Sequence, residues 1–254
     1  MNGMNGMNGM IAPLRYVFLV LADHPYGRAM LRELLAAELE PIAIIEERSA
    51  IAEQEAAKFE ARMAGFELAP RFDELLAGRA IERLAVANHN DEACAELLRA
   101  RAPDLLVLGG TRILRSRVFG LAKHTLNSHP GLLPEVRGSA SVAWAIETDV
   151  EIGCTCHFID AGVDTGPIVG RRTIPVHRGD TYEQLCWSTT SLSATLMREA
   201  VAAYAAGTLE SHPQGPGGTT YRNMPDEGVE RVRLKLAQGR YAHFVAGARP
   251  GRLS

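Results

Sequence analysis

The stretch Tyr16-Val-Phe-Leu-Val-Leu-Ala22 is a continuous apolar run of strand length. A strand that is buried on both faces carries apolar residues at every position, whereas a half-exposed strand alternates apolar with polar residues. We therefore predict that this run is a buried strand of a parallel sheet. The next segment, Gly27–Leu39, has apolar residues at helical spacing and predicts a helix.

Strands and helices alternate along the chain that follows. Further strands are predicted at Pro41–Ile45, Leu84–Ala87 and Asp104–Gly109, and helices at Ala50–Met63 and at Asp91–Arg101, the latter capped by Asn90. This alternation predicts an α/β fold with a mostly parallel, Rossmann-like sheet and helices on both faces. Ligands of such sheets bind beyond the carboxyl ends of the strands.

Composition changes at both ends of the chain. The triplet Met-Asn-Gly is repeated three times before Met10, so residues 1–14 are predicted to be a disordered leader. We assign residues 15–206 to one catalytic domain and residues 207–254 to a linker followed by a C-terminal helical extension, with its helix at Asp226–Tyr241. This tail either covers part of the site or mediates self-association into a homo-oligomer.

Charge and hydropathy favour small-molecule chemistry. The 254 residues are 46% hydrophobic and carry a formal net charge of -3, whereas nucleic-acid-binding domains are strongly basic. No apolar run is long enough to cross a bilayer, and no secretory signal is evident. We therefore expect a cytoplasmic protein with a small-molecule partner, and neither a nucleic-acid nor a membrane partner.

The cysteines and histidines do not predict a metal site. The four cysteines form no Cys-x-x-Cys pair, and no two histidines have the spacing of a helical zinc motif. Cys154 and Cys156 lie two apart on a predicted strand, so both should face one side and pack as small apolar residues.

Two short polar stretches supply the candidate catalytic groups, Asn127-Ser-His129-Pro130 and Gly162-Val-Asp164-Thr-Gly166. Asn127 and His129 lie two apart where a strand should end, so their side chains point the same way. An amide and an imidazole so placed can address one developing oxyanion. A carboxylate beside the imidazole would hold it in place and favour its charged form. Taken singly, Asn127 and Asp164 are more often turn residues, and a lone histidine is more often a satisfied surface or core residue than a catalyst.

A longer pattern connects these stretches. From residue 127 to 170 the chain reads NSHPGLLPEVRGSASVAWAIETDVEIGCTCHFIDAGVDTGPIVG. This closely resembles the folate-dependent formyltransferase family, which includes glycinamide ribonucleotide, methionyl-tRNA and sugar N-formyltransferases. The resemblance rests on the string N-x-H-P-x-L-L-P-x-x-R-G, the helix-like SASVAWAIE, the strand-like IGCTCHFID and the closing G-V-D-T-G-P-I, in that order.

The resemblance implies roles for individual residues. Asn127, His129 and Asp164 fall on the family's catalytic amide, imidazole and carboxylate. The co-substrate it implies is 10-formyltetrahydrofolate, held by main-chain groups in an apolar pocket. The implied contacts come from the loop after the strand at Asp104–Gly109 and from the loop before Asp164, and they are Thr111, Arg112, Ile113, Leu114, Ala161, Gly162 and Val163.

Differences between this sequence and two branches of the family narrow the range of possible formyl acceptors. Ala22-Asp-His-Pro-Tyr-Gly27 has an acid and a proline where the glycinamide ribonucleotide branch binds phosphate on a Gly/Ser-rich loop. The residues after Ala206 are too few for the extra barrel domain of the tRNA branch. We expect a small amine, such as an amino sugar nucleotide or a biosynthetic intermediate. Contacts to it are expected from His24, Tyr26 and Asn88.

The expected mechanism assigns Asn127 to the oxyanion, with His129 assisting, and Asp164 to the amine proton. Whether His129 or Asp164 is the formal base stays open, because strongly interacting groups titrate as a unit. Two other classes also stay open. One is a hydrolase that releases formate from the same folate, and the other is a non-catalytic folate- or metabolite-binding module.

Overall fold

The structure, a computed structural model, describes residues 13–247. Its strands are β1 (Tyr16–Leu21), β2 (Ala43–Glu47), β3 (Glu82–Val86), β4 (Leu105–Leu108), β5 (His124–His129), β6 (Val136–Gly138), β7 (Gly153–Phe158), β8 (Ile168–Thr173) and β9 (Thr219–Tyr221). Its helices are α1 (Pro25–Ala36), α2 (Ala50–Arg62), α3 (Phe72–Leu75), α4 (Glu92–Arg101), α5 (Ser116–Phe119), α6 (Ser141–Glu147), α7 (Tyr182–Ala205) and α8 (Asp226–Ala237).

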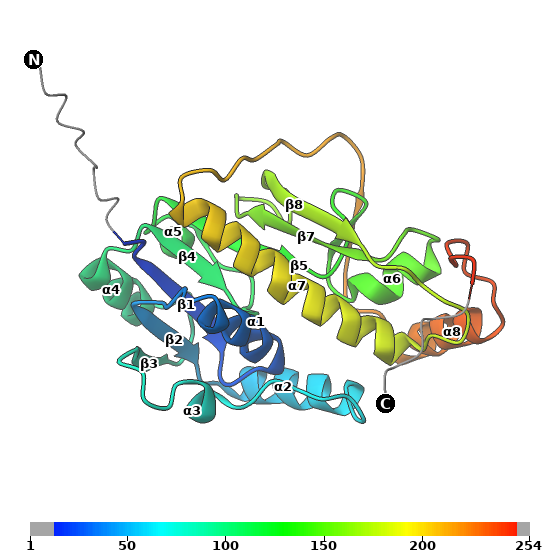
Figure 1. Cartoon of the computed structure of the whole chain (residues 1–254), viewed down its shortest axis with the longest axis horizontal. Coiled ribbons are helices and arrows are strands. Elements are labelled where there is room, and N and C mark those ends of the chain that lie inside the picture. Colours follow the sequence, from blue (N-terminus) through cyan, green and yellow to red (C-terminus); the bar gives the residue numbers. More distant parts are fainter. Residues whose placement is uncertain (1–12, 248–254) are drawn as a thin grey trace, which may run out of the picture.

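A seven-stranded sheet in the order β3-β2-β1-β4-β5-β7-β8 forms the centre of the molecule (Figure 1). The strands from β3 to β5 pair in parallel, whereas β5 with β7 and β7 with β8 pair antiparallel. The predicted α/β fold with a mostly parallel sheet is therefore confirmed. A separate two-stranded sheet joins β6 and β9.

Both faces of the sheet are covered, which explains the unbroken apolar run of β1. Tyr16, Phe18 and Val20 pack in one buried cluster with side chains of α1 and α7. Val17 and Leu19 pack in another, with side chains of α4 and α5 on the opposite face. Cys154 and Cys156 are buried in the first cluster as unpaired thiols, as their spacing predicts. Within residues 13–247, no helix is long and apolar enough to cross a membrane.

Two helix starts differ from the predicted ones. Helix α1 begins at Pro25 rather than Gly27, because His24 Nδ1 accepts the Tyr26 N–H at 3.2 Å and proline suits the first helical position. Helix α4 begins at Glu92, and the residue before it, Asp91, makes no side-chain cap bond. The prediction of Asn90 as its cap is wrong, because the Asn90 amide bonds to a loop beyond β4 instead.

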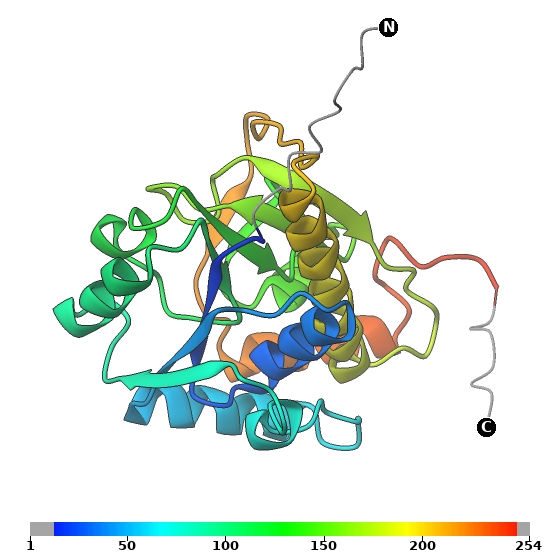
Figure 2. The ribbon, with the colours of Figure 1, turned by 60° about the vertical axis from the view of Figure 1, so that its left-hand side comes forward.

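The chain after α7, orange in Figures 1 and 2, runs back across the molecule before it enters α8. It contains β9, which pairs in parallel with β6, within a stretch that the Pro and Gly content predicts as loop. Helix α8 ends at Ala237, before the predicted Tyr241, and packs mainly on α6. The boundary at residue 206 stays a prediction, and most of the predicted leader lies outside the described residues.

A substitution at Gly27 tests how closely α1 packs against the sheet. A Cβ at this position would lie 2.5 Å from the carbonyl oxygen of Gly109, so Gly27→Ala should lower the free energy of unfolding by about 1–3 kcal/mol. Helix propensity alone would favour the alanine. The measurement is urea denaturation, with Gly170→Ala as control because its Cβ would lie 3.6 Å from Leu196. Equal stability of both variants would refute the close approach.

Candidate functional site

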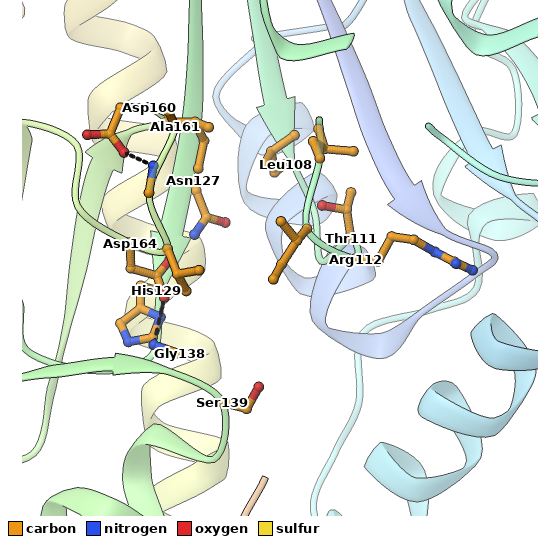
Figure 3. Close-up of a pocket in the computed structure, with 15 residues that line it drawn as sticks. Leu108, Thr111, Arg112, Asn127, His129, Gly138, Ser139, Asp160, Ala161 and Asp164 are labelled. Carbon is orange, nitrogen blue, oxygen red and sulfur yellow. Dashed lines mark hydrogen bonds and ion pairs between the residues drawn. The ribbon is translucent and has the colours of Figure 1, made fainter. Parts of the chain in front are cut away.

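A cavity of about 260 Å³ opens at the carboxyl ends of β4 and β5 (Figure 3). Figure 3 shows Asn127, His129 and Asp164 on one wall, opposite Thr111 and Arg112. Every catalytic or cofactor-contact residue predicted from the sequence lines this cavity, namely Thr111, Arg112, Ile113, Leu114, Asn127, His129, Ala161, Gly162, Val163 and Asp164. The place agrees with the rule for ligands of open parallel sheets.

Strand β5 fixes the amide and the imidazole on one side of the sheet. Asn127 and His129 both line the cavity, whereas Ser128 between them points away, as strand alternation requires. The carbonyl of Ser128 accepts a hydrogen bond from the Tyr26 hydroxyl at 2.6 Å. This bond ties β5 to α1 at the residue between the two catalytic candidates.

Asp164 is brought to the imidazole by a strained turn. Its backbone has a φ of 52°, in the left-handed region that few residues other than glycine adopt. Its carboxylate accepts the Gly138 N–H at 2.8 Å and lies 3.4 Å from His129 Nδ1. On its other side, Asp164 Oδ1 lies 3.4 Å from Nε2 of a second imidazole, His157. The carboxylate therefore sits between two histidines.

Backbone carbonyls determine which nitrogen of each ring carries the proton. His129 Nε2 lies 2.8 Å from the Val136 carbonyl, and His157 Nδ1 lies 2.8 Å from the Phe158 carbonyl. Because a carbonyl oxygen only accepts, we assign a proton to each of these nitrogens. In a neutral His129 ring the lone pair is then on Nδ1, which faces Asp164. In a neutral His157 ring it is on Nε2, where it accepts from Asn127 Nδ2 at 3.2 Å.

Burial decides the charge of His129. It lowers the pKa of His129 below 6.5 and outweighs the opposing attraction of Asp164. The carboxylate favours the charged imidazole as expected, but burial has the larger effect because His129 is only 4% exposed. Burial also raises the pKa of Asp164, but the attraction that His129 and His157 exert when they are protonated, together with the Gly138 N–H, lowers it to about 2. The cluster thus combines a neutral His129 with an ionised carboxylate.

His157 is the functional candidate that the sequence analysis missed. It pairs with Asn127 across β5 and β7, and Asn127 Nδ2 lies 3.2 Å from its Nε2. The sequence contains a signal for it. If Cys154 and Cys156 face the core, the next residue of that strand, His157, faces the opposite side, where the site lies.

The loop opposite the catalytic candidates is held by buried polar groups. Asn90 Nδ2 donates to the Ile113 carbonyl at 2.9 Å, and Asn90 Oδ1 accepts the Arg115 N–H at 2.7 Å. The Arg112 guanidinium pairs with Glu47, which is fully buried at the end of β2. The Ile113 side chain is nonetheless 73% exposed beside the cavity. The loop is thus rigid and presents an apolar side chain to a ligand.

The three residues expected at the acceptor have different surroundings. Tyr26 lines a smaller cavity of about 70 Å³, together with Pro130 and Ser141. His24 caps α1 and packs edge-on against Phe59, and burial lowers its pKa to about 4. The side chain of Asn88 accepts the Asn90 N–H at 2.8 Å. Tyr26 is therefore the best placed of the three.

Comparison with known proteins matches the formyl transferase family model to residues 15–201. Methionyl-tRNA formyltransferase of Anaeromyxobacter dehalogenans (strain 2CP-C) is 34% identical over 163 residues, which is 63% of this chain and 52% of the relative. Phosphoribosylglycinamide formyltransferase of Mycobacterium tuberculosis (strain ATCC 25618 / H37Rv) is 41% identical over 121 residues, 45% of this chain and 55% of the relative. The chain spans about half the length of the curated relatives it matches.

Solved structures share the fold. The formyltransferase PseJ from Anoxybacillus kamchatkensis, in complex with UDP-4,6-dideoxy-4-formamido-L-AltNAc and tetrahydrofolate, is 17% identical with a TM-score of 0.57, over 89% of this chain and 99% of that one. The N-formyltransferase from Helicobacter canadensis, with folinic acid and dTDP-3-aminofucose, is 15% identical with a TM-score of 0.62, over 88% and 80%. Because the family model spans most of the chain, the predicted resemblance is confirmed, and the chain belongs to the formyl transferase family.

Proposed function

We propose that this protein is an N-formyltransferase that moves a formyl group from 10-formyltetrahydrofolate to the amine of a small metabolite. The observation that carries the proposal is the carboxylate of Asp164 between the rings of His129 and His157, at the wall of a cavity. An amine that is acylated gives up a proton. A carboxylate beside the unprotonated Nδ1 of a neutral His129 can accept that proton together with the ring.

The residues of the cavity fit the ring system of a folate. Leu108, Leu114 and Ile159 supply apolar walls, and we assign main-chain contacts with the ring to the lining segments 111–114 and 161–163. Ligand pockets typically enclose about 300–1,000 Å³, so a cavity of about 260 Å³ suits one ring system rather than the whole folate. When bound, the folate supplies the formyl group, and the nitrogen that carried this group leaves as an amine.

Asn127 is assigned to the formyl oxygen. One N–H of its amide is directed at His157 Nε2, at 3.2 Å, which leaves the second N–H for a ligand in the cavity. Negative charge grows on the formyl oxygen while the acceptor amine attacks. A fixed donor at such an oxygen is worth about 3 kcal/mol of transition-state stabilisation, and His157 contributes by holding the amide in orientation.

His129 and Asp164 are assigned to the proton. The unprotonated Nδ1 of His129 and the carboxylate lie 3.4 Å apart, so a proton taken from the attacking amine is shared between them. The same proton is available to the departing nitrogen, which restores the cluster. As the new nitrogen–carbon bond forms and the old one breaks, protons balance without any further reactant.

Two adjoining cavities support a small acceptor. The cavity at Tyr26 shares Phe59, Met63 and Thr190 with a second cavity of about 230 Å³ between α1, α2 and α7. Arg62 lines the first of them and Arg32 the second. Arg62 in one cavity, and Arg32 with Glu67 in the other, suit a compact molecule that carries an amine and an anionic group, as in an amino sugar nucleotide or a biosynthetic intermediate.

The direct test incubates the protein with 10-formyltetrahydrofolate and a mixed library of amine metabolites, followed by mass spectrometry. We expect one amine to gain a single formyl unit. Release of formate without any formylated amine would instead identify a hydrolase. Tight folate binding without either product would identify a non-catalytic binding module.

Asp164→Asn tests the proton acceptor. The amide is nearly isosteric with the carboxylate but takes up no proton, so kcat should fall at least about a hundredfold. The dissociation constant of 5-formyltetrahydrofolate, measured by calorimetry, should change by less than about threefold. The matched control is Asp73→Asn, which removes an exposed carboxylate that is paired with Arg83, away from the cavity. Near-normal turnover of Asp164→Asn would refute this role.

The pH dependence of kcat/KM tests the charge of His129. Below the pKa of His129, which burial holds under 6.5, Nδ1 is protonated and accepts no further proton, so activity should fall with acid. Titration of Asp164 should not change kcat/KM near neutral pH, because its pKa is about 2. We expect kcat/KM to fall toward acid pH with a midpoint below pH 6.5. The control variant His243→Gln, which removes an exposed histidine, should show the same fall. Activity that rises as the pH falls through this range would contradict the neutral form of His129.

A further inference from the structure

The chain beyond the matched family segment contacts the site. We call residues 211–221 the return segment; it follows α7 and lies after residue 201, where the family model ends. His212 and Ile168 exchange two backbone hydrogen bonds of 2.8 Å. Further along, β9 pairs with β6, so the segment is anchored beside the cavity at both ends. Figure 2 shows this orange chain passing behind the main sheet.

Gln214 links the return segment to the turn that carries Asp164. Its Nε2 donates to the carbonyl oxygens of Asp164, at 2.8 Å, and Gly166, at 2.9 Å. Its Oε1 accepts two hydrogen bonds from Arg137, from Nη2 at 2.9 Å and from Nε at 3.3 Å. Both donors and the acceptor of the amide are therefore used, and the side chain is fixed between β6 and the turn.

Asp164 needs such support because of its backbone. A left-handed conformation of a residue other than glycine persists only where its surroundings hold it, and Asp164 has a φ of 52°. Gln214 binds the carbonyl of this same residue. A turn released from that bond would relax toward ordinary φ values and move the carboxylate away from His129.

The return segment also supports the other side of the carboxylate. Asp164 Oδ2 accepts the N–H of Gly138, which lies on β6 opposite Tyr221 of β9. Strand β9 approaches so closely that a Cβ at Gly138 would collide with the Tyr221 carbonyl. One segment thus fixes both the turn that presents the carboxylate and the backbone donor that receives it.

We infer that Gln214 is a positioning residue for Asp164, and that the return segment is an integral part of the formyl-transfer site. The inference about catalysis rests on the proposed function. The part that concerns the turn does not, because it can be measured without substrate.

The test compares Gln214→Ala and Gln214→Glu with the wild-type chain. The glutamate variant keeps an acceptor for Arg137 and loses both donors, so it isolates the bonds to the Asp164 and Gly166 carbonyls. The matched control is Gln238→Ala, the same substitution at an exposed position at the end of α8. Hydrogen exchange is followed in peptides covering residues 160–167, and kcat is measured with the acceptor found by the amine screen.

Both Gln214 variants should exchange amides of the 160–167 turn at least about tenfold faster, with peptides of β1 and α1 unchanged. They should lower kcat at least about tenfold and weaken 5-formyltetrahydrofolate binding less than that. Gln238→Ala should match the wild type in each measurement.

Wild-type exchange in the turn would overturn the inference, and so would faster exchange spread evenly over the whole chain, since that indicates general destabilisation. Faster exchange in the turn with an unchanged kcat would overturn the catalytic part. A wild-type protein that formylates no amine would refute the proposed function, while the exchange result would still decide whether Gln214 holds the turn.

Discussion

The contact between the Asp164 carboxylate and two imidazoles is the interaction on which the site depends. Each ring gives its proton-bearing nitrogen to a backbone carbonyl and turns its other nitrogen toward the same carboxylate. The carboxylate and the unprotonated Nδ1 of His129 are thereby brought together at one point, where burial keeps His129 neutral. At neutral pH neither the carboxylate nor His129 Nδ1 carries a proton, so the pair can take one up during the reaction. This property makes it suited to deprotonating an amine as a new bond to carbon forms.

The sheet explains how this arrangement is built. The change from parallel to antiparallel pairing occurs between β5 and β7, and it places Asn127 directly opposite His157. The turn after β7 then brings Asp164 back over the end of β5. On the other wall, the loop after β4 is tied to Asn90 and, through Arg112, to Glu47. Every catalytic candidate is therefore supported from a strand end or from a turn with a fixed conformation, rather than from a free loop.

Much of this could be predicted from sequence, and the failures have physical causes. Continuous apolar runs reveal buried strands, and the ordered string from Asn127 to Asp164 reveals the catalytic candidates. Asn90 has the residue type and place of a helix cap, but its amide bonds to a loop distant in sequence. The charge of His129 depends on burial, which no local pattern reports. Gln214 lies in a Pro- and Gly-rich stretch whose contacts with β6 and the Asp164 turn arise only when the chain folds back.

The protonation state of the imidazole cluster is the property to measure most directly. Nitrogen-15 NMR of the histidine rings at neutral pH, assigned with variants that lack His129 or His157, reports which ring nitrogens carry protons. We expect a proton on Nε2 alone in His129, with its Nδ1 unprotonated beside Asp164. A His129 ring that is protonated on both nitrogens at neutral pH would contradict the proposed mechanism, which needs an unprotonated Nδ1.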